Sequence, residues 1–389
     1  MKEKSLNKEQ LRIRAIDLFN SNWKIADICS TLKCTRSWFY KWLKRYIGKE
    51  PEWFKEQSRI PKTIKRSTDK QTEQSILETR KELISNSYMQ YGPQAIYYAL
   101  KLKGIDTPPV WTIARTLKRN NLTNKKKSSI YISKGKKYPY EYELCQQMDF
   151  IGPRYLYSKV RFYFHSLICC DTHYSQATIF KNQSSTNVCN SLVHFWKEAG
   201  IPDFLQMDND LSFWGSLNKP NALGKVIRLC LLHGVTPVFI PIKEPWRNGI
   251  VEHFNSKIQG SVLSSRQFES IDEIQLAVNQ FCQIHNQFHH YSSQEGMTPM
   301  DRMKYLNYPL VCLDPDYVFP EESFSLPEGE IHVIRFIRSD LRFNIFGLSF
   351  ILPEETKYEY INGVIITNEH CLKIFKEHEL ITNFDFKLY

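Results

Sequence analysis

The stretch PIKEPWRNGIVEHFN, residues 241–255, decides how the middle of the chain is interpreted. It begins with prolines and polar residues, which are typical of a loop, and becomes helical in pattern at Asn248. Glu252 is the only acidic residue after this transition, and it follows closely on Gly249. The sequence therefore predicts a helix that presents a carboxylate directly behind a loop.

Two aspartates upstream close segments that are expected to be strands. Asp149 comes at the end of YELCQQMDF, and Asp208 comes near the end of DFLQMDND. At the carboxyl edge of an open mixed sheet such residues converge, and a helix that crosses this edge can add one more side chain. We therefore expect Asp149, Asp208 and Glu252 to form one group. Each acid alone could be an ordinary turn or surface residue, and Asp171 is the alternative first member, although it lies in an expected hairpin turn.

Three carboxylates held close together repel one another and stay ionised only with cations between them. Hard oxygen ligands without a neighbouring Cys or His cluster suit Mg²⁺ or Mn²⁺. Two such ions can activate an attacking oxygen and stabilise the leaving oxygen of a phosphodiester. The group therefore predicts phosphodiester chemistry with two divalent ions.

The segment 141–308, which contains these acids, is expected to be one α/β domain. Its predicted order is three successive strands, then helix, strand, helix, strand and two helices, which is the order of a ribonuclease-H-like fold with a mixed five-stranded sheet. The stretch LSFWGSLNKPNALG, residues 211–224, is expected to be a surface insertion, either a lid or a neutral loop.

The N-terminal region, residues 1–50, has the pattern of a helix-turn-helix domain. Three amphipathic segments follow one another, and Thr35 is a plausible N-cap of the third. An ordinary three-helix bundle with a solvated basic face is the alternative. The third segment is expected to expose a DNA-binding face made of Arg36, Ser37, Tyr40, Lys41, Lys44 and Arg45.

A second helix-turn-helix domain is expected at residues 69–122, between basic linkers at 51–68 and 123–140. The linkers are predicted to track phosphates or to serve as disordered tethers. The residues predicted to contact DNA in this region are Thr112, Arg115, Thr116 and Arg119 on the last helix, and Lys125, Lys126 and Lys127 in the second linker.

Charge and composition indicate which classes of protein this chain can belong to. The net charge of +11 hides an asymmetry, because residues 1–140 are strongly basic and the remainder is mildly acidic. No apolar run is long enough to span a membrane, and no signal peptide begins the chain, so we expect a cytoplasmic protein. The ten cysteines form no C-x-x-C pair and are expected to be reduced thiols.

The tail, residues 309–389, is strand-rich and is expected to be a small β-barrel, with a β-rich dimer arm as the alternative.

The whole pattern resembles the DDE transposases and retroviral-type integrases, most closely bacterial insertion-sequence transposases with an integrase core. The matching segments are QQMDF, LQMDND and PWRNGIVEHFN around the three acids, with support from FHHYSSQEGMTP at residues 288–299. The step of 44 residues from Asp208 to Glu252 is longer than usual for the family. Retroviral members carry a lysine one turn past the glutamate, where this chain has Ser256 beside Lys257, and their N-terminal His/Cys zinc module is absent because no histidine precedes His165.

The resemblance implies a reaction and a set of roles. Asp149, Asp208 and Glu252 would be the catalytic triad and would hold two Mg²⁺ or Mn²⁺ ions. The residues that would support them are Asn209, Asn248, Gly249 and Asn255. The protein would cut double-stranded DNA at the ends of a mobile element, and the freed 3′-hydroxyl would attack target DNA, with a homodimer or higher oligomer assembled on the DNA. A regulator that no longer cuts, and a nuclease without strand transfer, are the alternatives.

Overall fold

The computed structural model describes residues 7–49, 51–56, 68–123, 138–216, 218, 221–264, 266–305, 310–320 and 325–388. The chain divides into two compact units, Met1–Ser67 and Thr68–Tyr389. The domain boundaries expected from the sequence are finer than this division and stay predictions. No helix in the described ranges combines the length and the apolar character needed to cross a membrane.

The first unit is a three-helix module made of α1 (Lys8–Asn20), α2 (Ile25–Thr31) and α3 (Arg36–Ile47). Asn7 begins α1 with a capping box, since its side chain accepts from the Glu9 amide and its own amide donates to Gln10. Thr35 caps α3, as predicted, by accepting from the Trp38 amide at 3.2 Å. Apolar faces of all three helices meet in a core that includes Ala15, Ile28 and Phe39.

The second unit begins with another three-helix module, α4 (Lys70–Ser85), α5 (Pro93–Leu102) and α6 (Val110–Arg119). This module packs against the α/β part of the same unit. The Tyr98 ring stacks on His290 with ring centroids 3.7 Å apart. Gly296 has a φ of +83°, and a Cβ atom there would lie 1.6 Å from the Tyr98 hydroxyl, so only glycine fits.

The α/β part is built on β1 (Cys145–Tyr155), β2 (Arg161–Cys169), β3 (Ser175–Phe180), β4 (Phe204–Met207) and β5 (Thr236–Phe239). The first three strands are antiparallel, and β4 and β5 continue beside β1 as parallel strands. This arrangement agrees with the expected ribonuclease-H-like core. The helices are α7 (Ser185–Ala199), α8 (Leu211–Trp214), α9 (Lys225–Leu232), α10 (Gly249–Ile258), α11 (Ile271–Phe288) and α12 (Pro299–Tyr305), with short turns η1 (Pro245–Asn248), η2 (Gln259–Leu263) and η3 (Ser292–Gln294).

Two apolar clusters cover opposite faces of this sheet. One joins β1, β2 and β4 to α7 and α9, and the other joins β1, β2 and β3 to α10 and α11. Because successive strand residues point to opposite faces, the neighbours Leu167 and Ile168 of β2 enter different clusters. The sheet is therefore buried on both sides, as in an α/β domain.

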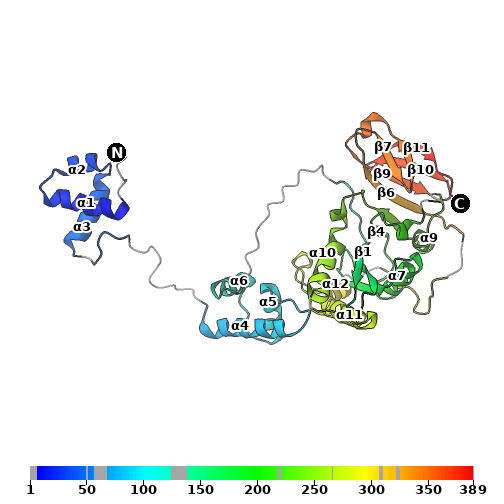
Figure 1. Cartoon of the computed structure of the whole chain (residues 1–389), viewed down its shortest axis with the longest axis horizontal. Coiled ribbons are helices and arrows are strands. Elements are labelled where there is room, and N and C mark those ends of the chain that lie inside the picture. Colours follow the sequence, from blue (N-terminus) through cyan, green and yellow to red (C-terminus); the bar gives the residue numbers. More distant parts are fainter. Residues whose placement is uncertain are drawn as a thin grey trace. The chain divides into compact units, whose positions relative to one another are not determined.

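The prediction of a five-stranded sheet was wrong, because the sheet has nine strands in the order β11-β10-β9-β6-β5-β4-β1-β2-β3. The tail supplies β6 (Glu330–Phe336), β9 (Tyr360–Ile366), β10 (Cys371–Lys376) and β11 (Glu379–Asp385), which are labelled in Figure 1. β6 pairs in parallel with β5. A hairpin of β7 (Arg342–Ile345) and β8 (Leu348–Ile351) and a turn η4 (Glu354–Thr356) complete the tail. The expected separate β-barrel is not confirmed, since these strands extend the core sheet.

Two local expectations also need correction. Asp149 does not end its strand, because β1 continues to Tyr155 and pairs Asp149 with Ser166 of β2. The stretch 211–224 is not simply a surface insertion. Its Phe213 is fully buried and stacks on Phe150 at 5.5 Å, and Trp214 is 5% exposed. The aromatic side chains therefore anchor the start of this segment in the core.

Candidate active site

The predicted triad comes from three elements that meet at one edge of the sheet. Parallel β1 and β4 are in register at Gln147 and Gln206. Asp149 and Asp208 each lie two residues beyond these glutamines, at the same level and on the same side of neighbouring strands. Glu252 lies in the first turn of α10, which packs across β1 and β2.

Hydrogen bonds from both strands fix the start of α10. The Gln147 side-chain oxygen accepts from the amides of Ile250 and Val251 at 3.1 and 3.0 Å. It thereby satisfies two of the helix amides that have no partner within the helix. From β4, the Gln206 side chain donates to the Arg247 carbonyl at 2.9 Å. Glu252 is thus held by contacts to the same two strands that carry the aspartates.

Asn248 is the residue that ties the loop to β1. It is 3% exposed, and its side chain donates to the Met148 carbonyl at 2.8 Å, one residue before Asp149. Gly249 has a φ of −63° and open space where a Cβ atom would lie, so the backbone places no demand for glycine there.

Sequence reasoning missed Gln147 and Gln206, although a signal for them exists. The tripeptide Gln-Met-Asp occurs twice, at 147–149 and 206–208. In register, the two glutamines lie side by side and hold one helix start, and the two aspartates lie side by side at the edge. The repeat therefore marks both the carboxylates and the residues that position them.

The acids share an electrostatic environment. The pKa of Asp149 is raised to about 7, first by burial and then by the negative charges of Asp208 and Glu252. The Asn255 side chain opposes this shift by donating to Asp149 Oδ2 at 2.9 Å. Burial also raises the pKa of Asp208 and that of Glu252. The edge therefore accumulates negative charge that protein groups compensate only in part.

The donor set fits a hard divalent cation. It consists of carboxylate oxygens, together with the buried Asn255 Oδ1, which has no hydrogen-bond partner. In the described part of the chain, no three His, Cys, Asp or Glu side chains have the spacing of a formed metal site.

Asn209, the residue after Asp208, fixes the loop that follows β4 through contacts with the loop after β5 and with β6. Its side chain donates to the Ile240 carbonyl at 2.8 Å and accepts from Arg335 of β6 at 2.7 Å. Asn209 therefore links the residue next to Asp208 to the strands contributed by the tail.

Two alternatives for site residues lie elsewhere. Asp171 is in the β2–β3 turn, where the Cys170 amide donates to the Cys145 carbonyl at the beginning of β1, away from the level of Asp149. Lys257 donates to the Tyr291 hydroxyl at 2.8 Å, and burial lowers its pKa to about 8. Its ammonium group is thus engaged inside the fold.

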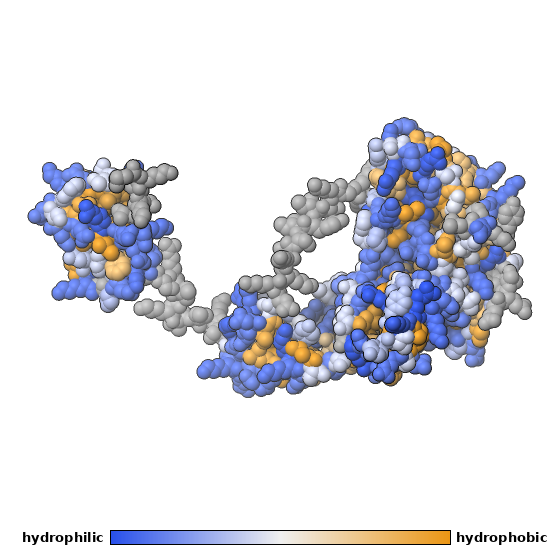
Figure 2. Space-filling view, in the orientation of Figure 1, coloured by the Kyte–Doolittle hydropathy of each residue, from blue (hydrophilic) through white to orange (hydrophobic). Residues whose placement is uncertain are grey.

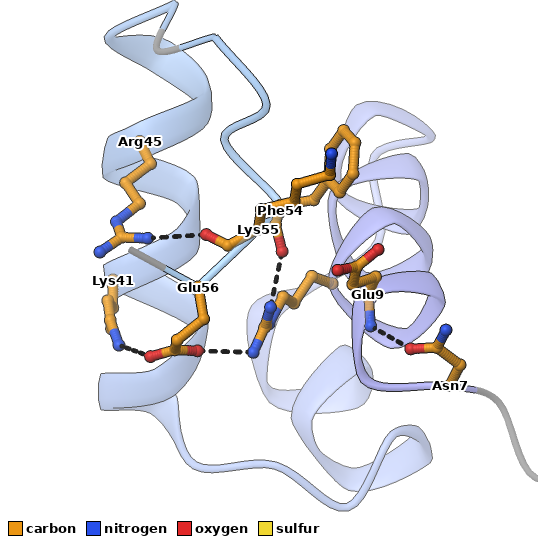
Figure 3. A network of polar contacts seen from close by, with 8 residues as sticks. Asn7, Glu9, Lys41, Arg45, Phe54, Lys55 and Glu56 are labelled. Atoms are coloured by element: carbon orange, nitrogen blue, oxygen red, sulfur yellow. Dashed lines mark hydrogen bonds and ion pairs between the residues drawn. The ribbon is translucent and has the colours of Figure 1, made fainter. Parts of the chain in front are cut away.

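The candidate DNA face of α3 is partly used by the protein itself. Residues 51–56, expected to begin a linker, fold back on α3, so that Lys41 pairs with Glu56 at 3.4 Å and Arg45 donates to the Lys55 carbonyl at 3.2 Å (Figure 3). Glu56 also pairs with Arg12, whose guanidinium stacks on Trp42. The predicted residues that are exposed and have no such contact with a described residue are Arg36, Ser37, Tyr40 and Lys44.

The candidate face of α6 needs one correction. Thr116 is 1% exposed rather than outward, because it lies between the core positions Ile113 and Leu117 on the helix. Arg115 is exposed over the Trp111 ring, whereas Arg119 pairs with Glu73 of α4 at 2.7 Å.

Thr112 is half-buried, and the exposed Trp111 and Lys118 were not predicted. Figure 2 shows apolar and polar side chains mixed on the visible surface of this module. Lys125, Lys126 and Lys127 lie outside the described residues.

Two segments of the chain match models of known domain families. Residues 233–299 match the model of an integrase core domain, and residues 6–52 match that of a homeodomain-like domain. These matches support the resemblance to the DDE transposase and integrase superfamily. No curated protein matches the chain.

Solved structures similar to this chain include two retroviral integrase cores. The HTLV-2 integrase catalytic core domain in complex with magnesium is 16% identical, with a TM-score of 0.32, over 40% of this chain and 93% of that one. The catalytic core domain of BIV integrase is 15% identical over 41% of this chain and 91% of that one, with a TM-score of 0.31. The assignment of an integrase core depends on the family model and the topology, because these overlaps are low.

Proposed function

We propose that this protein is a metal-dependent DNA transposase. The proposal is supported by the segments that match an integrase core domain and a homeodomain-like domain. One observation carries the proposal. Asp149 and Asp208 lie at the same level of neighbouring parallel strands, and the helix start that bears Glu252 is hydrogen-bonded to both strands. This is the arrangement in which three carboxylates can act on one phosphodiester.

The three carboxylates would hold divalent ions, Mg²⁺ or Mn²⁺. Two bound ions would supply Lewis-acid activation of the attacking oxygen and stabilisation of the leaving oxygen. The protein's own residues would place this chemistry. Asn255 orients Asp149 through its hydrogen bond, and Gln147 and Asn248 keep the start of α10 against β1. Water would attack first, and the freed 3′-hydroxyl would then attack target DNA in line.

The helical modules would bring the element ends to this site. Arg36, Tyr40 and Lys44 form an exposed face on α3, which is suited to a groove of double-stranded DNA. Arg115 on α6 offers a further exposed cation. Two element ends must be cut together, so the proposed working form is a homodimer or a higher oligomer on DNA.

The test is a strand-transfer assay with Mg²⁺, using oligonucleotides that carry the inverted repeats flanking the gene. The parental protein is expected to nick these ends and join them to target DNA, and Asp208→Asn is expected to do neither. Nicking without joining would instead indicate a nuclease. Binding without either reaction would indicate a regulator that no longer cuts.

A further inference from the structure

Arg335 of β6 is a buried cation in an unusual setting. It is 6% exposed, and burial lowers its pKa to about 9. Its guanidinium donates to the carbonyls of Asn344, Ile240 and Ile334 and to the Asn209 side chain, at 2.7 to 3.1 Å. These acceptors are neutral, and no described carboxylate pairs with Arg335. The protein thus keeps a nearly buried positive charge without a negative partner, which is costly unless a ligand supplies one.

Arg335 lines a cavity of about 240 Å³ between the loop after β5 and the turn from β6 to β7. Three exposed cations share the lining, namely Lys243, Arg338 and Arg342, and none of them forms an ion pair with a described residue. Two acids are also present. Glu244 is engaged by Arg247 at 2.9 Å and by the Tyr360 hydroxyl, and Asp340 is exposed on the turn. The cavity is therefore positive overall.

The volume of this cavity and the hydrogen-bond donors that line it indicate which kind of ligand it can bind. Small-molecule pockets usually begin at about 300 Å³ and are mostly apolar, whereas this one is smaller and is lined by four basic side chains. A guanidinium suits a phosphate oxygen because its planar donors match the geometry of the anion. Of the five N–H groups of a guanidinium, four are used here, so one Nη2 hydrogen is left to donate.

We propose that this cavity binds a backbone phosphate of DNA and links that contact to the acidic edge. The link is short, since Arg335 donates to Asn209, which is the neighbour of Asp208. A phosphate beside Arg335 would stabilise the charge that orients Asn209. The inference depends on the proposed function in one respect, because the bound phosphate would belong to the DNA that is cut or joined. Arg335 is then a positioning residue, acting on Asp208 through Asn209.

The first experiment measures how duplex binding depends on salt, with the full chain and without divalent metal. The double variant Arg338→Ala/Arg342→Ala should lower the slope of log K against log salt by about 1 to 2, as expected for one or two lost phosphate contacts. The matched control is Lys159→Ala/Lys181→Ala, which removes the same charge from exposed positions outside the cavity and should leave the slope nearly unchanged. An unchanged slope in the first variant, or an equal loss in the control, would overturn the proposal.

A second arm separates DNA from free phosphate as the source of the anion. If inorganic phosphate raises the melting temperature above chloride at equal ionic strength, but the double variant keeps the parental salt slope, the cavity holds only a free anion and the DNA contact is refuted. Arg335→Lys, which retains the charge, should preserve DNA cutting better than Arg335→Met, with the difference in kcat rather than in KM. Equal kcat values would refute the link to Asp208. Because the salt slope is measured without cutting, it can succeed even if the proposed transposase activity fails.

Discussion

The charged side chains of the acidic edge, Asp149, Asp208 and Glu252, differ in burial and pairing from those on the basic face of α3. At the edge, Asp149, Asp208 and Glu252 are at least partly buried, and each has a raised pKa. On α3, Lys41 and Arg45 find partners in the segment that folds back on the helix, while Arg36 and Lys44 remain exposed. The edge thus concentrates charge that the protein leaves largely uncompensated, whereas the helix face has part of its charge already satisfied.

This difference shows how each region would gain free energy when it binds a ligand, a cation at the edge and DNA at the helix face. A buried carboxylate without a counter-ion destabilises the folded protein, and a cation that binds there recovers this cost. A solvated basic side chain costs the fold little, and its contribution to DNA binding comes from the release of counter-ions. A single substitution at the edge should therefore lower the rate of DNA cutting strongly. Each substitution on the helix face should lower the affinity for duplex DNA by a smaller amount.

The largest effect is expected for Glu252→Gln. This change keeps the shape of the side chain but removes its charge, so cutting and joining should fall by roughly 10³-fold or more. Duplex binding should stay within a few-fold of the parental value, because the helical modules are untouched. Parallel strand-transfer and binding assays check this, and joining at the parental rate would refute the triad.

A smaller effect is expected from the exposed part of α3. Arg36→Ala/Lys44→Ala should weaken duplex binding by about 1 to 3 kcal/mol at moderate salt, since both cations are free to contact DNA. Lys41→Ala is the matched control and should change binding much less, because Lys41 already pairs with Glu56. Titrations at several salt concentrations measure both variants. Equal losses would show that the segment 51–56 does not mask its side of the helix.

Gln147→Ala tests whether the edge depends on its supporting contacts. The change leaves the amides of Ile250 and Val251 without their acceptor, which should destabilise the protein by about 1 to 3 kcal/mol. It should also lower the rate of cutting while DNA binding is unchanged. Denaturant unfolding and single-turnover cutting measure the two effects. Gln267→Ala, at an exposed position, is the control and should alter neither.

The smallest effect concerns stability and pH at Asp149. Its pKa is about 7 in the folded protein, against an ordinary value of 3.8, so the folded state holds the proton over a range where the unfolded state has lost it. Stability should therefore fall as pH rises from about 4 to 7, and it should stay lower above that range. Asp149→Asn removes this loss and should raise the melting temperature by a few degrees at pH 8, but hardly at pH 4. Melting curves without divalent metal test this, and an equal shift at both pH values would contradict it.

The elements that carry the candidate site could be predicted from the sequence more completely than the sheet around them, while the roles of the site residues stay a prediction. Asp149, Asp208 and Glu252 were singled out because each lies beside a short apolar strand or at a helix start, and the structure brings these elements together, although β1 continues six residues past Asp149. The pairing of β5 with β6 could not be found, because Val238 and His332 are far apart in the chain and no local pattern encodes their contact. Thr116 was misplaced for a related reason, since its polarity suggested solvent although the helical period turns it inward.

The same β5–β6 pairing bears on how fragments of this protein can be made. Val238 and Phe239 are fully buried, and β6 hydrogen-bonds along the outer side of β5. A fragment that stops at residue 308 would leave an apolar strand with a row of open amides and carbonyls, which is a template for aggregation. Fragments intended to remain soluble should therefore keep β6 together with β9, the strand that in turn pairs with β6.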